Sequence, residues 1–137
     1  MTDDNRPPPL DREIVDEFVL RAHGDFDYVQ RVADEEPQIV NGARDWGGGD
    51  WETALGAASH MGRRDIALFL LEHGARMDIF AAAMLGEIEV VIAMLTAHPE
   101  LAEARGPHGI PLVKHAEVGG EDARNVLALL THEPAGV

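Results

Sequence analysis

Acidic residues and histidines suited to acid–base chemistry lie in two separate parts of the chain. Asp50, Glu52 and His60 are close together in the sequence, and His108 lies in a later loop flanked by glycines. A carboxylate beside an imidazole fixes the tautomer of the ring and raises its basicity, as general acid–base catalysis requires. Asp50, Glu52, His60 and His108 are therefore the candidate catalytic residues if the fold brings the two parts together.

The same side chains suggest a weaker alternative, a metal site formed by His60, His108 and either Asp50 or Glu52. The two histidines lack the close ligand spacing of zinc-binding motifs. The chain also has no cysteine, which excludes thiolate zinc sites and cysteine nucleophiles. We therefore expect no metal and no cofactor, and whether the protein is an enzyme at all is open from the sequence.

Charge and hydropathy narrow the classes of partner. The formal net charge is −14, which repels nucleic-acid phosphates and anionic membrane surfaces and favours a basic partner or a cationic ligand. The first residues lack the basic start and apolar run of a signal peptide, and no apolar stretch approaches the roughly 20 residues that span a bilayer. We expect a cytoplasmic protein that binds neither nucleic acid nor membrane.

Paired helices are expected on either side of four glycines, Gly24, Gly62, Gly86 and Gly119. Apolar residues recur at helical spacing around each glycine, and proline or glycine follows most of the helices. The expected pairs are 11–24 with 25–33, 53–61 with 64–72, 79–85 with 87–97, and 111–118 with 121–130. Residues 11–132 form one domain, with a disordered leader at 1–10 and a frayed tail at 133–137.

One unit, residues 53–78, shows the helix–loop–helix repeat in full, and parts of it recur elsewhere. The matching positions are Thr53-Ala54-Leu55-Gly56, Ala58-Ser59, Gly62, Asp65-Ile66-Ala67, Leu70-Leu71 and Gly74-Ala75, then Glu89-Val90-Val91 with Met94-Leu95, and Pro111-Leu112 with Ala116 and Gly119. This pattern resembles the ankyrin repeat family. The resemblance implies an all-α fold, an α-solenoid of about four repeats, and protein binding through the loop tips and the inner helix face.

The chain departs from the family pattern in two ways. The histidine near the start of the family's first helix is replaced by Gly56, Phe80 and Val113 in three of the units. The four glycines are separated by 38, 24 and 33 residues, whereas a regular array has about 33 each time. We call the loop that precedes each helix pair a finger. The short interval removes the third finger, before the helices expected at 79–97, and the long interval enlarges the second finger, at residues 46–52.

A missing finger between two present ones predicts a notch. Its floor would be Phe80 and Met84, and its walls would be the loops at residues 46–52 and 106–109. A small molecule could bind there, with Trp46 and Trp51 as walls and the candidate acid–base residues beside it. The opposing interpretation is that Trp46 or Trp51 folds over the gap and fills it as core.

We expect first a protein-binding module, and as the alternative a small-molecule-binding protein or cofactor-independent enzyme that uses the notch. The oligomeric state is expected to be a monomer or a weak homodimer. His23, His73, His98 and His132 are given structural or solvated roles. The expected binding residues are Trp46, Trp51, His60, Met61, Phe80, Met84, Leu85, His108 and His115.

Overall fold

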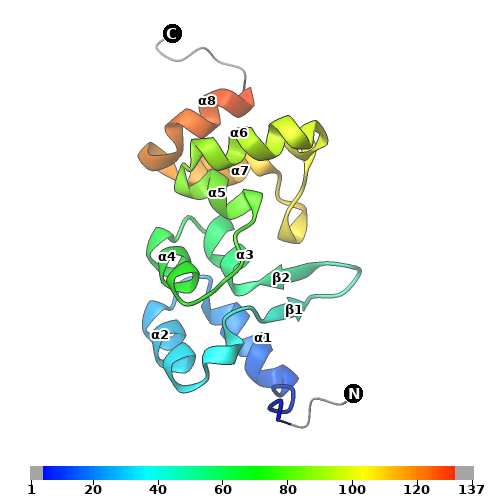
Figure 1. The fold of residues 1–137 in the computed structure, drawn as a ribbon, viewed down its shortest axis with the longest axis vertical. Coiled ribbons are helices and arrows are strands. Elements are labelled where there is room, and N and C mark those ends of the chain that lie inside the picture. Colours follow the sequence, from blue (N-terminus) through cyan, green and yellow to red (C-terminus); the bar gives the residue numbers. More distant parts are fainter. Residues whose placement is uncertain (1–4, 132–137) are drawn as a thin grey trace.

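The computed structural model describes residues 5–131, and within this range the chain is mostly helical. Four helix pairs follow one another along the longest axis of the molecule (Figure 1). The pairs are α1 (Arg12–Arg21) with α2 (Phe26–Glu35), α3 (Ala54–His60) with α4 (Arg64–Glu72), α5 (Ile79–Leu85) with α6 (Ile88–Ala97), and α7 (Leu112–Val118) with α8 (Arg124–Thr131). The all-α expectation is thus confirmed at the level of helix content.

The first helices of the pairs pack against one another in chain order, α1 on α3, α3 on α5 and α5 on α7. Alanines such as Ala57, Ala81 and Ala82 are fully buried on these helices. Small side chains allow neighbouring helix axes to approach closely, which a stack of short helices requires. Thr53 and Asp78 cap α3 and α5 by accepting hydrogen bonds from backbone N–H groups in the first turn of each helix.

The core consists of two clusters that meet at α5. Ala81, Met84 and Leu85 of α5 belong to the cluster formed with the N-terminal pairs, while Ile79 and Ala83 belong to the C-terminal cluster. The short helix α5 therefore joins the two halves of the molecule.

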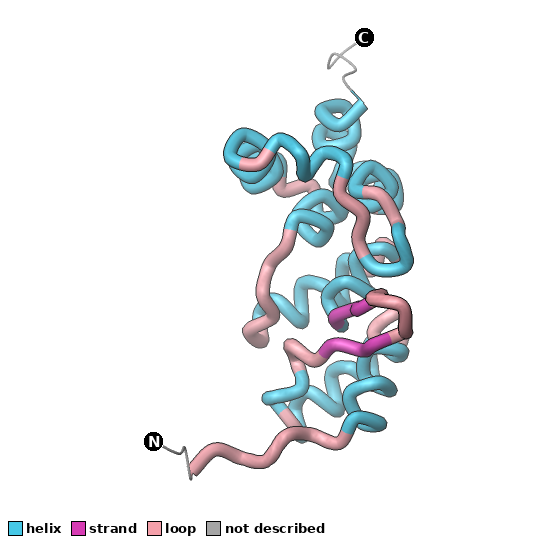
Figure 2. The backbone as a smooth tube through the Cα atoms, turned by 90° about the vertical axis from the view of Figure 1, so that its right-hand side faces the viewer, coloured by secondary structure: helices cyan, strands magenta, loops and turns pink. Residues whose placement is uncertain are grey.

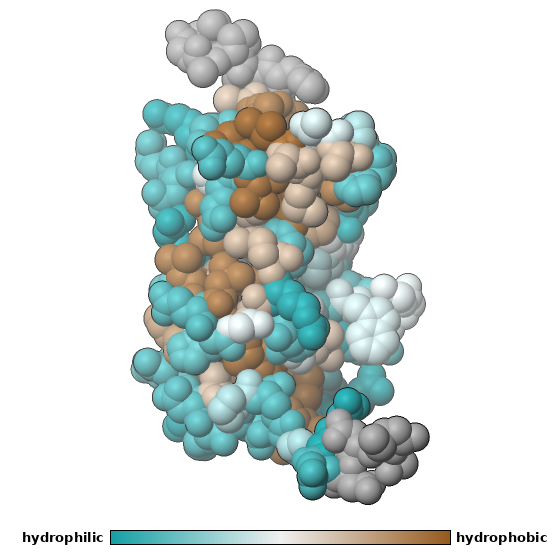
Figure 3. Space-filling model, in the orientation of Figure 1, coloured by the Kyte–Doolittle hydropathy of each residue, from teal (hydrophilic) through white to brown (hydrophobic). Residues whose placement is uncertain are grey.

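On the outside, α6 is strongly apolar, and Figure 3 shows apolar side chains gathered over the part of the surface where this helix lies.

A small antiparallel hairpin stands where the sequence predicts only a loop. Strand β1 (Ala43–Asp45) pairs with β2 (Trp51–Thr53), with Arg44 opposite Glu52. Three consecutive glycines at the tip, Gly47, Gly48 and Gly49, all have positive φ, which only glycine adopts at little cost. Figure 2 shows the hairpin extending beside the loop that contains η3 (Pro107–Gly109).

Several boundaries differ from those predicted. The last pair contains a 3₁₀ turn, η4 (Gly120–Ala123), so that α8 begins at Arg124 rather than at residue 121. Two further 3₁₀ turns, η1 (Pro37–Ile39) and η2 (Pro99–Glu103), follow α2 and α6. Leu10, predicted to lie in a disordered leader, packs against the first core cluster. Residues 1–4 and the expected tail at 133–137 lie outside the described residues.

The third loop finger is missing, as the spacing of the glycines predicts. The chain passes from α4 through residues 73–78 directly into α5, without a hairpin or a 3₁₀ turn. The hairpin and the loop at residues 105–111 are the two fingers on either side of this gap. Between residues 5 and 131, no helix is long and apolar enough to span a membrane.

Candidate metal centre and neighbouring pocket

Three imidazole nitrogens converge on one carboxylate oxygen of Glu52. The Oε2 atom of Glu52 lies 2.8 Å from Nε2 of His60, 3.2 Å from Nε2 of His23 and 3.3 Å from Nε2 of His108. His23 follows the end of α1, Glu52 is the central residue of β2, His60 ends α3, and His108 lies in η3. Four separate elements thus direct their side chains to one point.

Glu52 is fully buried because the central residue of β2 points inward, whereas its neighbours in the strand are exposed. Its second oxygen, Oε1, accepts a hydrogen bond of 2.9 Å from Nε1 of Trp46. Burial alone would raise the pKa of Glu52, but hydrogen bonds from His23, His60 and Trp46 outweigh it and lower the pKa to about 2. Glu52 is therefore an anion held in place from two sides.

Hydrogen bonds made by the Nδ1 atoms fix the tautomers of two of the histidines. Nδ1 of His23 lies 3.1 Å and 3.0 Å from the carbonyl oxygens of Val19 and Leu20, and Nδ1 of His108 lies 2.6 Å from Oδ2 of Asp50. Carbonyl and carboxylate oxygens only accept hydrogen bonds, so both Nδ1 atoms carry a proton. In the neutral ring, Nε2 then presents a lone pair toward Glu52.

A lone pair that faces a carboxylate oxygen is repelled unless a positive charge lies between them. Protonation of His23 is one source of that charge, and the hydrogen bond to Glu52 raises the pKa of this imidazole. A neutral His60 ring can donate from Nε2 to Glu52, whereas protonating both His23 and His108 would place two cations beside one anion. A single metal cation satisfies all four donor atoms together.

The backbone at His108 is held in an unusual conformation. Its φ of 61° is the only positive value for a non-glycine residue between residues 5 and 131. Asp50 maintains this conformation by accepting hydrogen bonds from both the backbone N–H of His108, at 2.8 Å, and its ring. The backbone bond is also the main cause of the lowered pKa of Asp50. Strained backbone of this kind concentrates at functional sites.

The cluster is compact enough for four donor atoms to reach one metal ion after small side-chain movements. One donor atom each from His23, Glu52, His60 and His108 lies within 4.8 Å of the other three. At metal–ligand distances of about 2.0–2.1 Å, neighbouring ligand atoms around a tetrahedral ion are about 3.3 Å apart. Three nitrogens and one oxygen suit Zn²⁺ and neighbouring first-row ions better than Mg²⁺ or Ca²⁺, which prefer oxygen ligands.

The surroundings match those of known metal ligands. Metal-bound histidines usually donate their other ring N–H to a carbonyl or carboxylate, as His23 and His108 do here. Ligating carboxylates are commonly hydrogen-bonded in turn, as Glu52 is by Trp46. The ring of Trp46 is itself fixed by the guanidinium of Arg44, 3.7 Å from its centroid.

The structure brings the four sequence candidates together but changes their roles. Glu52, His60 and His108 form the cluster, whereas Asp50 lies behind His108 and orients it. His23, predicted to be only structural or solvated, is a full member. His23 lies just before Gly24, as residues 60–61 lie before Gly62. This matching position in the sequence could have identified His23 as a neighbour of His60. The sequence predicts no metal, whereas this geometry favours a metal ion held by these four side chains.

A pocket of about 360 Å³ occupies the predicted notch. Phe80 lines it, and neither tryptophan fills it, since Trp46 is 37 % and Trp51 60 % exposed. Met84 and Leu85, predicted as binding residues, are instead buried, because their side chains pack into the core cluster formed with the N-terminal helix pairs. The lining residues are Gly49, Asp50, Trp51, Thr53, Gly56, Asp78, Phe80, Arg105, Gly106 and Pro107.

His115 is buried behind this pocket rather than lining it. The ring packs 4.8 Å from that of Phe80, and its Nδ1 donates to the carbonyl oxygen of Pro111 at 3.0 Å. Its Nε2 is the single buried side-chain nitrogen or oxygen within residues 5–131 that has no hydrogen-bond partner. Burial lowers the pKa of His115, so the ring is neutral and Nε2 is an unused acceptor.

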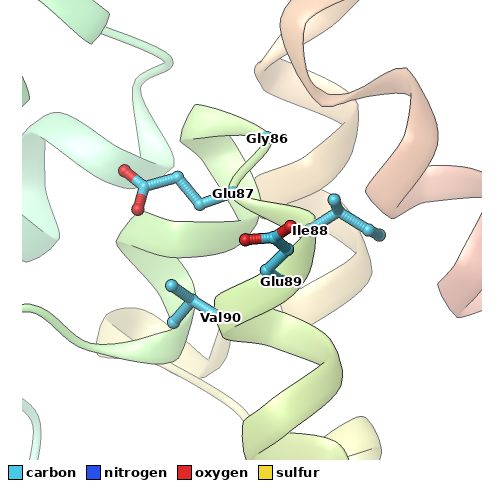
Figure 4. Close-up of a pocket in the computed structure, with 5 residues that line it drawn as sticks. All are labelled: Gly86, Glu87, Ile88, Glu89 and Val90. Carbon is cyan, nitrogen blue, oxygen red and sulfur yellow. The ribbon is translucent and has the colours of Figure 1, made fainter.

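A second hollow lies at the start of α6 and is formed by five consecutive residues, Gly86 to Val90. Figure 4 shows that the side chains of Glu87, Ile88 and Val90 point in different directions. Because no polar groups converge there, this hollow lacks the features of a binding site.

Comparisons with known proteins assign no family to the chain. No family model matches it, and neither a curated protein nor a solved structure is significantly similar to it. The function therefore has to be inferred from the residues of the chain itself.

The raised pKa of Asp78, which lines the pocket, predicts how the stability of the fold depends on pH. Burial raises its pKa although backbone N–H groups of α5 donate to it. A raised folded-state pKa gives stability that is present below the unfolded pKa and lost as the pH rises through the folded pKa. Asp78→Asn keeps a capping side chain without the charge, so we expect it to be more stable than the wild type at neutral pH, by less than about 1 kcal/mol.

Urea denaturation of both proteins at several pH values measures this difference. The advantage of Asp78→Asn should disappear on acidification below about pH 4, where Asp is protonated in both states. An advantage that stays constant with pH would show that the charge of Asp78 is not its cause.

Proposed function

We propose that this protein is a metal-binding protein that holds one Zn²⁺-like cation through His23, Glu52, His60 and His108. One observation carries the proposal: three histidine Nε2 atoms lie within 3.3 Å of a single buried carboxylate oxygen. All four donors are side chains, and the most exposed of them, His108, is 32 % accessible. An ion can therefore enter from the side of η3.

The scaffold is, in the same proposal, a divergent array of ankyrin-like repeats. The stacked helix pairs, the glycines between their helices and the two projecting fingers support it. In this array the second and fourth fingers supply Glu52 and His108, while the ends of two inner helices supply His23 and His60. The long interval between Gly24 and Gly62 would then provide the enlarged finger that carries Glu52, and the short interval between Gly62 and Gly86 would leave the gap that forms the pocket.

Partner binding is a second candidate function, because apolar side chains close to the cluster are exposed. Leu20 and Met61 are 43 % and 51 % exposed and lie near His23 and His60 in sequence. The acidic net charge favours a partner with basic residues around an apolar anchor. Titration with a synthetic lysine- and leucine-rich peptide tests this; unchanged NMR signals at Leu20 and Met61 would contradict it.

Metal titration of the chelator-treated protein tests the main proposal. Equilibrium dialysis with Zn²⁺, Co²⁺, Ni²⁺ and Mg²⁺, followed by elemental analysis, should give one Zn²⁺, Co²⁺ or Ni²⁺ per chain and no Mg²⁺. Ion at 100 times the dissociation constant stabilises the fold by about 2.7 kcal/mol, which corresponds to a rise of about 10 °C in melting temperature.

His60→Ala should abolish this stabilisation, whereas His98→Ala should retain it. His98 is a matched control because its ring is 64 % exposed and lies outside the cluster. If none of the four ions binds stoichiometrically, or if His60→Ala binds them like the wild type, the proposal is wrong.

Trp46→Phe tests the hydrogen bond behind Glu52. The substitution keeps an aromatic ring against Arg44 and His108 but removes the N–H that donates to Oε1. Loss of an outer hydrogen bond to a ligand commonly lowers metal affinity 10- to 100-fold, and we expect a loss of about tenfold. Trp51→Phe, which changes an exposed ring, is the control, and equal affinities of the two variants would contradict the role of Trp46.

A further inference from the structure

We propose that the pocket between the hairpin and the loop at residues 105–109 binds a small molecule through a primary ammonium group. None of the four proposed metal ligands lines the pocket, although Asp50 both lines it and holds His108. Its volume of about 360 Å³ is at the small end of the range for ligand sites, which suits a metabolite rather than a peptide. The proposal does not depend on a bound metal.

Asp78 provides the charge that an ammonium group would pair with. Its Oδ1 accepts a hydrogen bond of 2.8 Å from the backbone N–H of Ala81, and no ion pair with it is found in residues 5–131. The one cationic side chain in the lining, Arg105, instead donates to the carbonyl oxygen of Gly109 at 2.9 Å. Burial without a countercharge also explains the raised pKa of Asp78.

The remaining groups of the pocket are those that recognise a cation. Trp51 and Phe80 supply aromatic rings, and an ammonium group is attracted to the face of such a ring. An ammonium group brings three N–H donors and no acceptor, so it complements the carboxylate of Asp78 and the faces of these two rings.

The charge of the whole chain favours the same class of ligand. A net charge of −14 raises the local concentration of cations and opposes the entry of anions. A simple alkylamine and an amino acid both carry an ammonium group, but only the amino acid also has a carboxylate that could reach Arg105. The test therefore includes one compound of each kind.

The test compares ligands of one carbon skeleton with the chelator-treated full chain: butylamine, 4-aminobutyrate, butanol and butyrate. The Trp46→Phe variant leaves Trp51 as the one tryptophan, so its fluorescence reports on the pocket. We expect a saturable change with one or both of the ammonium compounds and none with butanol or butyrate. Stronger binding of 4-aminobutyrate than of butylamine would identify an amino acid as the source, and the reverse a simple amine.

Asp78→Asn in the same background should weaken the binding at least tenfold, whereas Asp27→Asn, at an exposed carboxylate of α2, should not change it. Circular dichroism confirms the fold of both variants. Equal binding of butanol or butyrate, no response to either ammonium compound, or an unchanged affinity in Asp78→Asn would overturn the proposal. None of these results bears on Zn²⁺ binding, so the two proposals fail separately.

Discussion

Glu52→Gln is expected to reduce Zn²⁺ affinity by at least 100-fold without unfolding the protein. Glutamine has nearly the shape of glutamate, and its carbonyl oxygen can still accept the hydrogen bond from Trp46. Its amide nitrogen would then donate toward the Nε2 lone pairs of the histidines, which neutral rings offer. The change therefore removes the anionic ligand but keeps the cluster packed.

The substitution should cost more stability with Zn²⁺ than without it. Hydrogen bonds from His23, His60 and Trp46 lower the pKa of Glu52 to about 2, so loss of the carboxylate should destabilise the metal-free protein at neutral pH. With Zn²⁺ added, the wild type should gain stability that the variant does not gain, and the difference between them should widen. Calorimetric titration gives the affinities, and thermal unfolding with and without Zn²⁺ gives the stabilities.

An equal loss of stability with and without Zn²⁺ would support an ion-pair cluster without a metal. In that case Glu52→Gln would lower the melting temperature equally with and without Zn²⁺, because the lost interaction would be with protonated histidines. Glu100→Gln, at an exposed glutamate beside His98, is the control for a change of charge alone.

Gly86→Ala is expected to cause the largest loss of stability, about 3–5 kcal/mol. Gly86 ends α5 with a φ of 76°, which is unfavourable for any residue with a Cβ atom. A Cβ atom at this position would also lie 1.8 Å from the backbone oxygen of Asp122 in η4. Backbone cannot move aside like a flexible side chain, so η4 would have to separate from α5.

Gly74→Ala separates these two causes. Gly74 also has a positive φ, 101°, but nothing lies within 4 Å of a Cβ built there. We expect it to lose only about 1–2 kcal/mol, the cost of the backbone conformation. Urea denaturation at constant pH measures both variants, and equal losses would show that the contact with Asp122 does not determine the stability of this junction.

The sequence predicted the helix pairs and the missing third finger because both follow from spacing, but it left open whether the gap forms a pocket or is filled by a tryptophan. The short interval between Gly62 and Gly86 leaves no residues for a third finger, and this holds whatever the neighbouring side chains are. The hairpin was missed because its strands are only three residues long and show no clear alternation of apolar residues. Three glycines in the turn favour a flexible loop and a hairpin equally well.

The cluster of His23, Glu52, His60 and His108 was only partly predictable, because its geometry depends on contacts between distant elements. His23 joins the cluster only when β2 turns Glu52 inward toward the end of α1, and the register of a short hairpin cannot be read from composition. Met84 was misplaced for a related reason. Its position before Gly86 suggests an open face, but its side chain packs into the first core cluster, against residues that are distant in the sequence.

His23 and His108 lie 85 residues apart in the chain, and this separation affects how a metal-loaded stack would unfold. In this stack of helix pairs the first pair packs mainly against the second, so it can open independently of the last pair. A bound ion would act as a cross-link that closes a long loop, and such a link removes conformational entropy from the unfolded chain. The first unit and the last finger would then open together, and loading with metal would change a chain of loosely coupled steps into one cooperative transition.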